Sequence, residues 1–326
     1  MKPHDNEQIK HWLQLAEARL DFKEFDFHSN LPVFGRAIQF FRQNWNNVST
    51  RWYVRFLAQQ QTEFNATLIG ALQALAGSNQ QQAQTIRQLE QQILLLKSKF
   101  NFRPGSQDEE IFLAINDPQS NEYQLPEDFA PEDIVFDIGM HVGSFSYGSL
   151  SRGAGQVYGF EALPENFELA SRNLAPFGGQ THLFNRAIWR SDQPNQVLPF
   201  HISNDKTNTG GGSVVHGTGQ LEVQTLSLDE MLNQVSQVRL LKIDAEGSEF
   251  PILFTCTKLD KVQAICGEFH EIGGTYNPAP IPAISQVVGY QKYTVIELES
   301  FLRRQGFSFK AQRDGKSSLG KFWAWR

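Results

Sequence analysis

The sequence predicts an α/β fold with a mainly parallel sheet in residues 103–326, preceded by an α-helical region. Two observations predict the sheet: short apolar segments alternate with segments of helix length, and a glycine-containing turn follows the first apolar segment. A third observation predicts the helical region, because apolar residues recur there in steps of four and three. We therefore expect three parts: residues 1–66, 67–102 and 103–326.

The main strands of the predicted sheet are short and apolar. They cover residues 133–138, 156–161, 181–188, 238–244 and 264–270. The helices between and after them cover residues 144–151, 164–175 and 228–235, with one more ending near Gly306. Ser227 with Glu230, and Thr294 with Glu297, have the spacing of a capping box at a helix start. Strands joined through helices in this way are parallel neighbours.

Two further strand pairs complete the expected architecture. Residues 197–202 and 221–226 form an added hairpin or flanking strands around the glycine-rich loop 204–215, which we expect to fold over a ligand. Residues 307–311 and 321–325 form an antiparallel hairpin at the C-terminal end of the domain, turning at Asp314-Gly315.

Residues 1–66 form an aromatic and basic helical region. Phenylalanine, tryptophan and arginine are frequent between His28 and Gln61. An aromatic helix with arginines suits a membrane surface, where the rings enter the interface and the arginines meet lipid phosphates. Packing of the helix on a neighbour explains the same composition, so both alternatives stay open.

Residues 67–102 form a coiled-coil-like helix. Its apolar seam, including two polar positions, consists of Leu68, Leu72, Leu75, Asn79, Gln82, Ile86, Leu89, Ile93, Leu96 and Phe100. A seam with this spacing faces one partner along its whole length. The sequence favours a homo-oligomer through this helix over an intramolecular helical hairpin, and Gly77-Ser78 is a potential break.

Composition bounds the class of protein. The net charge of -6 disfavours nucleic acid as a partner, because nucleic-acid-binding proteins usually carry a basic surface. Two cysteines, no signal peptide and no apolar run of spanning length predict a cytoplasmic protein, with a peripheral membrane location as the alternative.

The first chemical signal is the segment VFDIGMHVGSF at residues 135–145. A strand ends at Asp137, and Gly139 and Gly143 follow in a tight turn before a helix. Glycines allow close approach of a ligand, and the helix start offers free N–H groups. The pattern D-x-G-x-x-x-G lacks the glycine set of pyrophosphate-binding turns, which disfavours a nicotinamide cofactor.

Acidic residues at the ends of later strands give two more signals. Glu161 ends the next strand, at a position where a carboxylate typically binds ribose hydroxyls. LLKIDAEGSE at residues 240–249 places Lys242 and Asp244 at the end of a buried strand. Ionisable groups are costly there unless they are paired or functional.

Together these segments resemble a known family. VFDIGMHVGSF, GFEALPENFELASRNL, NRAIW, LSLDEML, KIDAEGSE and EFH occur in order and are similar to FkbM-type methyltransferases, a branch of the class I, Rossmann-type fold. The resemblance implies S-adenosylmethionine as cofactor and a hydroxyl of a sugar, polyketide or related metabolite as acceptor.

The resemblance also implies roles for individual residues. Asp137, Gly139 and Gly143 would line the methionine side of the cofactor. Glu161, followed by Ala162, would bind its ribose, and Asp244 would lie near the transferred methyl group. His141 departs from the family, which usually has asparagine there, and would supply a hydrogen bond in its place.

A second resemblance concerns the N-terminal region. RWYVRFLAQQQTEFN at residues 51–65 is similar to a short module at the front of bacterial glycosyltransferases and methyltransferases that build surface polysaccharides. It implies a glycan or glycolipid-like acceptor. Methylation of a small secondary metabolite and a non-catalytic scaffold are the alternatives.

The predicted catalytic residues are His270, Asp244 and Glu268. Glu268 and His270 lie two residues apart on one strand and so share a face. In one interpretation His270 is the general base, oriented by Glu268 or Asp244. In the other, Asp244, Glu268 and His270 hold a divalent cation such as Mg²⁺ that lowers the pKa of the acceptor.

Overall fold

The computed structural model describes residues 14, 34–49, 51–216, 219 and 221–326. The predictions for most of residues 1–33 therefore lie outside the described residues. The chain forms two compact units, residues 1–92 and 93–326, and each is described by itself.

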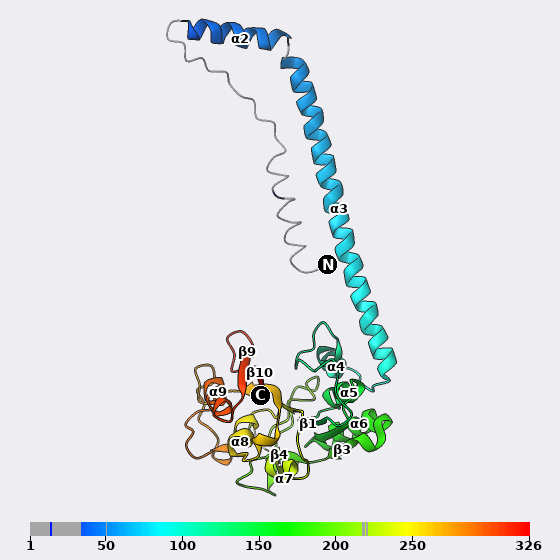
Figure 1. Cartoon of the computed structure of the whole chain (residues 1–326), viewed down its shortest axis with the longest axis vertical. Helices are drawn as coiled ribbons and strands as arrows, with labels where there is room; N and C mark the ends of the chain where they lie inside the picture. The colour runs from blue at the N-terminus through cyan, green and yellow to red at the C-terminus, as the bar shows by residue number, and fades with distance from the viewer. Residues whose placement is uncertain (1–13, 15–33, 50, 217–218, 220) are drawn as a thin grey trace. The chain divides into compact units, whose positions relative to one another are not determined.

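The described residues of the first unit contain α2 (Gly35–Ser49) and α3 (Arg51–Ser98), of which α3 continues into the first residues of the second unit (Figure 1). The predicted break at Gly77-Ser78 is wrong, because α3 runs through both residues without interruption. A hairpin folded at these two residues is therefore excluded, whereas pairing of α3 with a partner stays a prediction. One glycine costs a helix only about 1 kcal/mol relative to alanine, and the flanking alanines, leucines and glutamines favour the helix. The predicted boundary at residues 66 and 67 falls inside α3.

Helix α2 leaves aromatic side chains accessible. Phe40, Phe41 and Trp45 are exposed on it. No helix among the described residues is long and apolar enough to cross a membrane. Contact of α2 with a membrane surface stays a prediction.

The second unit is built on a seven-stranded sheet of order β3-β2-β1-β7-β8-β10-β9. Its parallel strands are β1 (Ile134–Ile138), β2 (Gln156–Phe160), β3 (Thr181–Phe184), β7 (Leu240–Ile243) and β8 (Ala264–His270). The antiparallel pair is β9 (Ser308–Arg313) and β10 (Leu319–Trp325), with β10 beside β8. The structure thus confirms the predicted parallel sheet and C-terminal hairpin.

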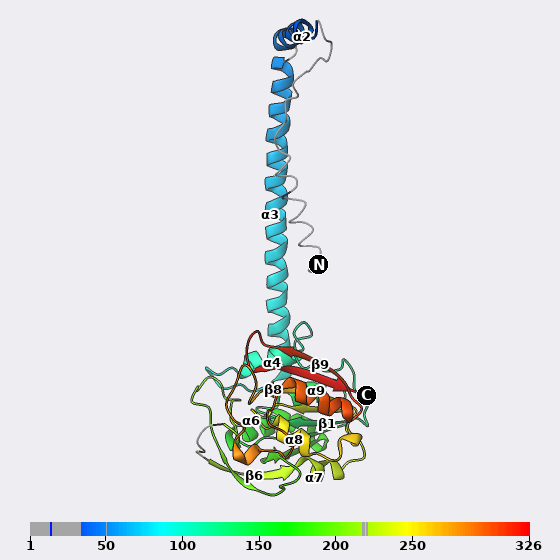
Figure 2. The same cartoon turned by 90° about the vertical axis from the view of Figure 1, so that its left-hand side faces the viewer.

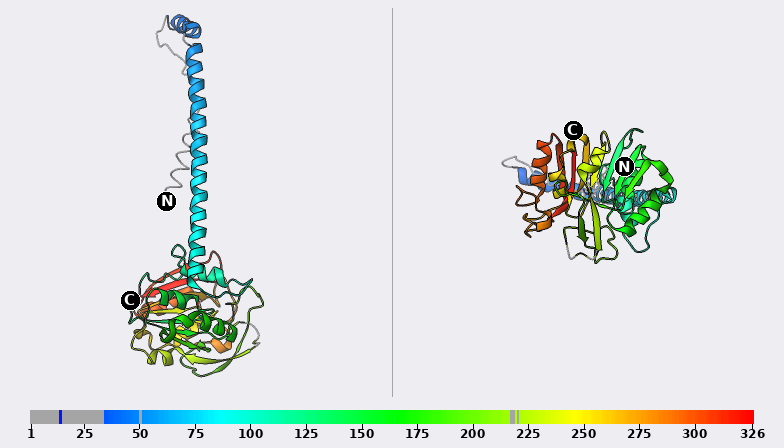
Figure 3. Two further views of the ribbon diagram at one scale, coloured as in Figure 1. Left: turned by 90° about the vertical axis from the view of Figure 1, so that its right-hand side faces the viewer. Right: turned by 90° about the horizontal axis from the view of Figure 1, so that it is seen from below.

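Helices cover both faces of this sheet, and the views in Figure 3 let the layers be followed. One face packs against α4 (Asp108–Asn116), α5 (Ser144–Ser151) and α6 (Pro164–Leu174). The other packs against α7 (Leu228–Asn233), α8 (Glu249–Thr255) and α9 (Val295–Arg304). Successive strand residues serve opposite cores: Val135 packs with the first set and Phe136 with the second. Helix α9 lies beside β9 (Figure 2).

The predicted strand at residues 181–188 is instead two strands in two sheets. After β3 the chain turns at Asn185, whose side chain donates hydrogen bonds to the carbonyls of Glu161 and Ala162. Strand β4 (Ala187–Trp189) then joins a small sheet of order β4-β6-β5, with β5 (Val197–Phe200) and β6 (Leu221–Ser227). Three short 3₁₀ helices complete the elements, at Ala175–Gln180, Leu259–Lys261 and Ala283–Ser285.

The two predicted caps have different outcomes. The Ser227 hydroxyl accepts the Glu230 N–H at 3.1 Å, as predicted. The Thr294 hydroxyl instead bonds the Glu297 carboxylate. At this helix start, the Val295 N–H is accepted by Glu271 from the end of β8, at 2.9 Å. Glu271 thus satisfies a free N–H group of the first helical turn, which is a different donor from the Glu297 N–H that a capping box would have bonded.

The hairpin also fixes a segment that sequence patterns left without structure. Trp323 on β10 donates its indole N–H to the carbonyl of Tyr123 at 3.1 Å. The Tyr123 side chain is buried against Phe145 of α5. The segment around residues 117–131 is therefore held beside the carboxyl ends of the strands.

Candidate active site

Gly139 brings the first strand turn against the end of β7. Its φ is +74°, and a Cβ there would lie 1.8 Å from the carbonyl oxygen of Asp244. The Lys242 ammonium donates to the Gly139 carbonyl at 2.6 Å. Only glycine permits both the left-handed backbone and the close approach. The packing of the end of β1 against the end of β7 therefore requires glycine at position 139.

Asp137 lies buried at the end of β1, directly before the turn, and contacts Lys242 and Ser146. It is fully buried, accepts a hydrogen bond from Ser146 at 2.7 Å, and forms an ion pair with Lys242 at 3.4 Å. Burial disfavours the charge of Lys242, but Asp137 and Asp244 outweigh it and raise the pKa of this ammonium. Asp137 and Gly143 are not among the residues that line the cavity described next, so direct cofactor contact by them stays a prediction.

A cavity of about 420 Å³ opens at the carboxyl ends of β1, β2, β7 and β8. Its wall includes six of the predicted site residues, namely Gly139, His141, Glu161, Ala162, Asp244 and Glu268. Its volume lies in the range of small-molecule sites, about 300–1,000 Å³. The buried hydroxyl of Ser144, at the start of α5, also lines it and has no hydrogen-bond partner among the described residues.

Glu161 is held by two backbone donors. Its carboxylate accepts the N–H of His141 at 2.8 Å and of Leu163 at 2.9 Å. Burial nevertheless raises the pKa of Glu161 to about 7. A carboxylate has about four acceptor positions, so beside these two donors and Asn166 the group can still receive a ribose hydroxyl.

His141 links the turn to the glycine-rich loop. It has φ of +55°, and its Nε2 lies 2.8 Å from the Thr209 hydroxyl and 3.0 Å from the Arg103 guanidinium. Burial, with further help from Arg103 and Lys242, lowers the pKa of His141 to about 4, against the opposing effect of Asp108. His141 is therefore neutral at pH 7 and acts as a hydrogen-bonding side chain.

The glycine-rich loop closes one side of the cavity, as predicted. The Thr209 hydroxyl donates to Asp108 at 2.8 Å, and its carbonyl accepts from Asn166 of α6 at 3.0 Å. The wall includes Asp205, Lys206, Asn208 and Gly210 of this loop.

His270 lies between two glutamates rather than beside Glu268. Its Nε2 is 3.2 Å from Glu246, and its Nδ1 is 3.2 Å from the buried Glu249. Burial opposes a charge on the ring, but Glu249 and Glu246 outweigh it and raise the pKa of His270 well above its usual value. A ring held between two carboxylates is poorly placed to take the proton of an acceptor hydroxyl, and His270 is not among the residues that line the cavity. The structure therefore does not support His270 as general base.

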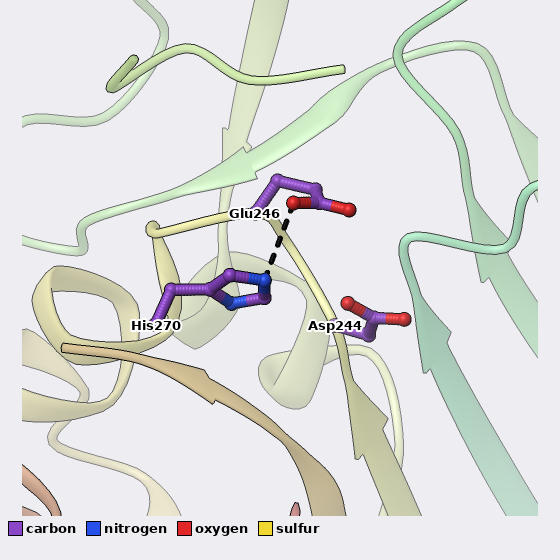
Figure 4. Close-up of side chains that lie close together, drawn as sticks. All are labelled: Asp244, Glu246 and His270. Atoms are coloured by element: carbon purple, nitrogen blue, oxygen red, sulfur yellow. Dashed lines mark ion pairs between the residues drawn. The ribbon is translucent and has the colours of Figure 1, made fainter. Parts of the chain in front are cut away.

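Glu268 faces a different neighbour. Its carboxylate forms an ion pair with Lys321 of β10 at 3.2 Å, and Lys321 also lies 3.4 Å from Glu122. Burial and the nearby Asp244 carboxylate raise the pKa of Glu268 to about 7, against the effect of Lys321. The predicted triad of Asp244, Glu268 and His270 is thus corrected: the third member beside Asp244 and His270 is Glu246 (Figure 4).

Sequence reasoning missed four contributors to the site: Tyr123, Glu246, Glu249 and Lys321. Tyr123 donates its hydroxyl to Asp244 at 3.0 Å from a segment without a motif. Glu246 and Glu249 stand inside KIDAEGSE, so the signal was present in the sequence. Lys321 could not be placed without knowing that β10 lies beside β8.

The sheet order, the turn at the end of β1 and the acidic end of β2 together define a class I, S-adenosylmethionine-dependent methyltransferase. The methyltransferase FkbM domain matches residues 137–309, more than half of the chain. The chain belongs to this family and is an enzyme of EC class 2.1.1. The matched segment contains the turn, Glu161, Asp244 and His270.

Several solved structures share distant similarity with this chain. TrmK from M. capricolum, in complex with S-adenosylhomocysteine, is 10% identical over 61% of this chain and 62% of its own, with a TM-score of 0.32. An rRNA methylase from Streptococcus thermophilus is 11% identical over 66% and 92%, with a TM-score of 0.33. Precorrin 8w decarboxylase from Methanobacterium thermoautotrophicum is 13% identical over 70% and 96%, with a TM-score of 0.35. No curated protein matches the chain.

The residues around the cavity fit S-adenosylmethionine. Glu161 offers acceptors for its ribose hydroxyls, and the unpartnered Ser144 hydroxyl at the start of α5 offers a polar contact for its amino acid end. Gly139 leaves the turn free of a side chain.

Proposed function

We propose that this enzyme methylates a hydroxyl of a sugar in a glycan or glycolipid-like precursor. The observation that carries the proposal is the composition of the cavity wall at the ends of β7 and β8. Asp244, Glu246 and Glu268 stand there, beside Glu122. Carboxylates accept hydrogen bonds from neutral hydroxyls and repel anionic acceptors, so this wall suits a polyhydroxylated substrate.

S-adenosylmethionine supplies a methyl group on a positively charged sulfur. The protein must orient the acceptor oxygen, and well-oriented systems gain about 7–11 kcal/mol from positioning. Tyr123 and Lys242 fix the Asp244 carboxylate, at 3.0 and 3.7 Å. Asp244 thus orients the hydroxyl, and Asp244 or Glu268 on the same wall receives its proton.

The glycan part of the proposal rests on the N-terminal region. The run at residues 51–65 is similar to a module that precedes enzymes of surface-polysaccharide assembly, and it opens α3. A helical extension of this kind suits an enzyme that works on a carrier-bound or polymeric acceptor. The cavity of the sheet domain by itself favours an acceptor with a hydroxyl group, and it does not distinguish a sugar from another hydroxylated molecule.

The test is methyl transfer by the full chain from labelled S-adenosylmethionine to neutral oligosaccharides, with a hydroxylated polyketide lactone in parallel. We expect label in a methyl ether of the oligosaccharide. Asp244→Asn should lower kcat at least about 100-fold, since it removes the orienting charge and one proton acceptor. S-adenosylhomocysteine binding by this variant checks that the cofactor site persists. Methylation of the lactone alone would overturn the assignment to sugars.

A further inference from the structure

Asp244, Glu246 and His270 form a compact cluster, which we call the DEH cluster (Figure 4). One oxygen or nitrogen from each residue lies within 4.8 Å of the other two. Ligands of an octahedral ion with bonds of about 2.1 Å stand about 3 Å apart when adjacent and about 4.2 Å when opposite. Glu246 and His270, 3.2 Å apart, already have the spacing of adjacent ligands, and the 4.8 Å limit leaves all three atoms within a small movement of sharing one small cation.

Glu249 orients the histidine of this cluster. Its carboxylate is fully buried and accepts the N–H groups of Ala245 at 2.8 Å and of Gly247 at 3.1 Å. His270 Nδ1 lies 3.2 Å from it, so Nε2 points toward Glu246. A metal-bound histidine usually places its other ring nitrogen against such a carboxylate, which fixes the tautomer and the ring.

The surroundings favour a cation and supply a further polar group. Two carboxylates of the cluster face one imidazole, with Glu249 behind it, whereas Glu268 is paired with Lys321 and lies outside the cluster. The one ammonium beside the cluster in the described part of the chain is Lys242, which lies against Asp244 Oδ2 at 3.7 Å. Ser248 lines the same cavity with a buried hydroxyl that lacks a partner among the described residues. The cluster therefore carries more negative than positive charge. The Ser248 hydroxyl beside it is a further polar group that a bound ion or its water could contact.

We propose that the DEH cluster binds a divalent cation of the magnesium or manganese class. Carboxylate oxygens are the preferred ligands of these ions, and one imidazole is compatible with manganese. Binding itself does not depend on the acceptor. The role of the ion rests on the proposed function: Asp244 and Glu246 line the cavity, so the ion would receive the acceptor hydroxyl and lower its pKa.

The test is a titration of the purified full chain with Mn²⁺, followed by the loss of the free-ion electron paramagnetic resonance signal. No cofactor or acceptor is present. We expect one saturable site per chain, displaced by excess Mg²⁺. Glu246→Gln should weaken binding at least about tenfold, and Glu249→Gln about 10–100-fold, because the latter releases the ring.

Glu268→Gln is the matched control, since it removes a cavity carboxylate outside the cluster and should bind Mn²⁺ like the wild type. Thermal unfolding of each variant checks the fold. The proposal is overturned if the wild type binds no Mn²⁺, or if Glu246→Gln binds as tightly as Glu268→Gln. If the enzyme methylates sugars but binds no Mn²⁺, the cation site is contradicted and the proposed function stands. If it binds Mn²⁺ but does not methylate sugars, the cation site stands and the proposed acceptor is contradicted.

The seam of α3 carries a second, independent proposal. Its seven apolar residues from Leu68 to Leu96 are 46–79% exposed. In heptad terms, one row (a) contains Leu72, Asn79, Ile86 and Ile93, and the other row (d) contains Leu68, Leu75, Gln82, Leu89 and Leu96. Isoleucine at a with leucine at d favours two parallel helices, and a single asparagine at a selects this pairing.

We infer that α3 pairs in parallel and in register with α3 of a second copy of this chain. The flanking positions between Leu72 and Leu96 agree, because Glu90 is the one charged residue at e or g and no like charges oppose each other. In register, Asn79 meets Asn79 and Gln82 meets Gln82, so both polar residues find hydrogen-bonding partners. In an antiparallel pair, row a would face row d instead.

Light scattering and disulfide trapping test this pairing. We expect a dimeric mass for the full chain, and a monomeric mass for Ile86→Asp but not for Gln84→Asp on the outer face. Under mild oxidation Gln82→Cys should form dimers and Gln84→Cys should not, over the low background of the two buried native cysteines. A monomeric wild type, or equal trapping of both cysteine variants, would overturn the inference.

Discussion

At the residue scale, Glu161 carries the clearest physical consequence. It is a buried carboxylate whose pKa is about 7, mainly because of desolvation and despite the N–H donors of His141 and Leu163. Its folded-state pKa lies above its ordinary value of 4.5. The group therefore stabilises the cofactor-free fold below about pH 4.5, and this contribution is lost as the pH rises through about 7.

The same titration should control cofactor affinity. An ionised carboxylate accepts stronger hydrogen bonds from ribose hydroxyls than a protonated one. We predict that the affinity for S-adenosylhomocysteine rises about tenfold between pH 6 and pH 8, within the limit of tenfold per pH unit set by one proton. Calorimetric titration at several pH values measures it.

Two variants separate this effect from others. Glu161→Gln should bind weakly and without the pH dependence, whereas Glu168→Gln, at an exposed position on the following helix α6, should keep it. His141, with a pKa near 4, titrates below this range, and Lys242 stays charged throughout. A rise of the same size in Glu161→Gln would assign the titration to another group.

Individual residues differed in how far the sequence could predict them. Gly139 and Glu161 stand at fixed places in a strand–turn–helix–strand pattern, so their position on the cavity wall followed from local order. The neighbours of His270 and Glu268 could not be predicted in this way, because they depend on the conformation of the turn after β7. That turn has Glu246 at φ of +47° and Gly247 at +98°, which brings Glu246 back over His270.

At the element scale, the glycine-rich loop is the element most closely tied to the cofactor turn. Thr209 joins it to Asp108 and His141 through one hydroxyl. We predict that Thr209→Val raises the dissociation constant of S-adenosylhomocysteine roughly tenfold, since it removes two hydrogen bonds of about 0.5–1.5 kcal/mol each while keeping the side-chain shape.

Thr207→Val is the matched control for this prediction. Its hydroxyl bonds only Asp205 on the exposed part of the same loop, at 2.7 Å. It should bind the cofactor product like the wild type. Equal binding by both variants would mean that the loop contributes nothing to cofactor affinity.

Helices and strands were predicted well where a single sequence period runs through the whole element. They were predicted poorly where a long-range contact divides an apolar run. The seam of α3 has a uniform period, and α3 forms even through Gly77. Residues 181–188 form one apolar run, but the Asn185 side chain bonds the chain after β2 and divides the run between two sheets. Such a side-chain contact over 24 residues in sequence has no signature in a local pattern.

At the scale of the whole molecule, alternation of strands and helices was enough to predict the parallel sheet and its antiparallel edge. The order of the strands completes the site, because β7 and β8 lie beside β1 and bring Asp244 and Glu268 to the cavity that Gly139 and Glu161 begin. We conclude that the carboxyl ends of these strands bind S-adenosylmethionine at the Gly139 turn.

Calorimetric titration of S-adenosylhomocysteine into the full chain and two alanine variants tests that claim most directly. Gly139 and Gly105 have nearly the same φ, +74° and +75°, but a Cβ meets the Asp244 carbonyl at Gly139 and nothing within 4 Å at Gly105. Circular dichroism and thermal unfolding establish that each variant is folded. We predict one binding site in the wild type and in Gly105→Ala, and at least about 100-fold weaker binding in a folded Gly139→Ala. A wild type that does not bind, or a Gly139→Ala that binds like Gly105→Ala, would contradict the account.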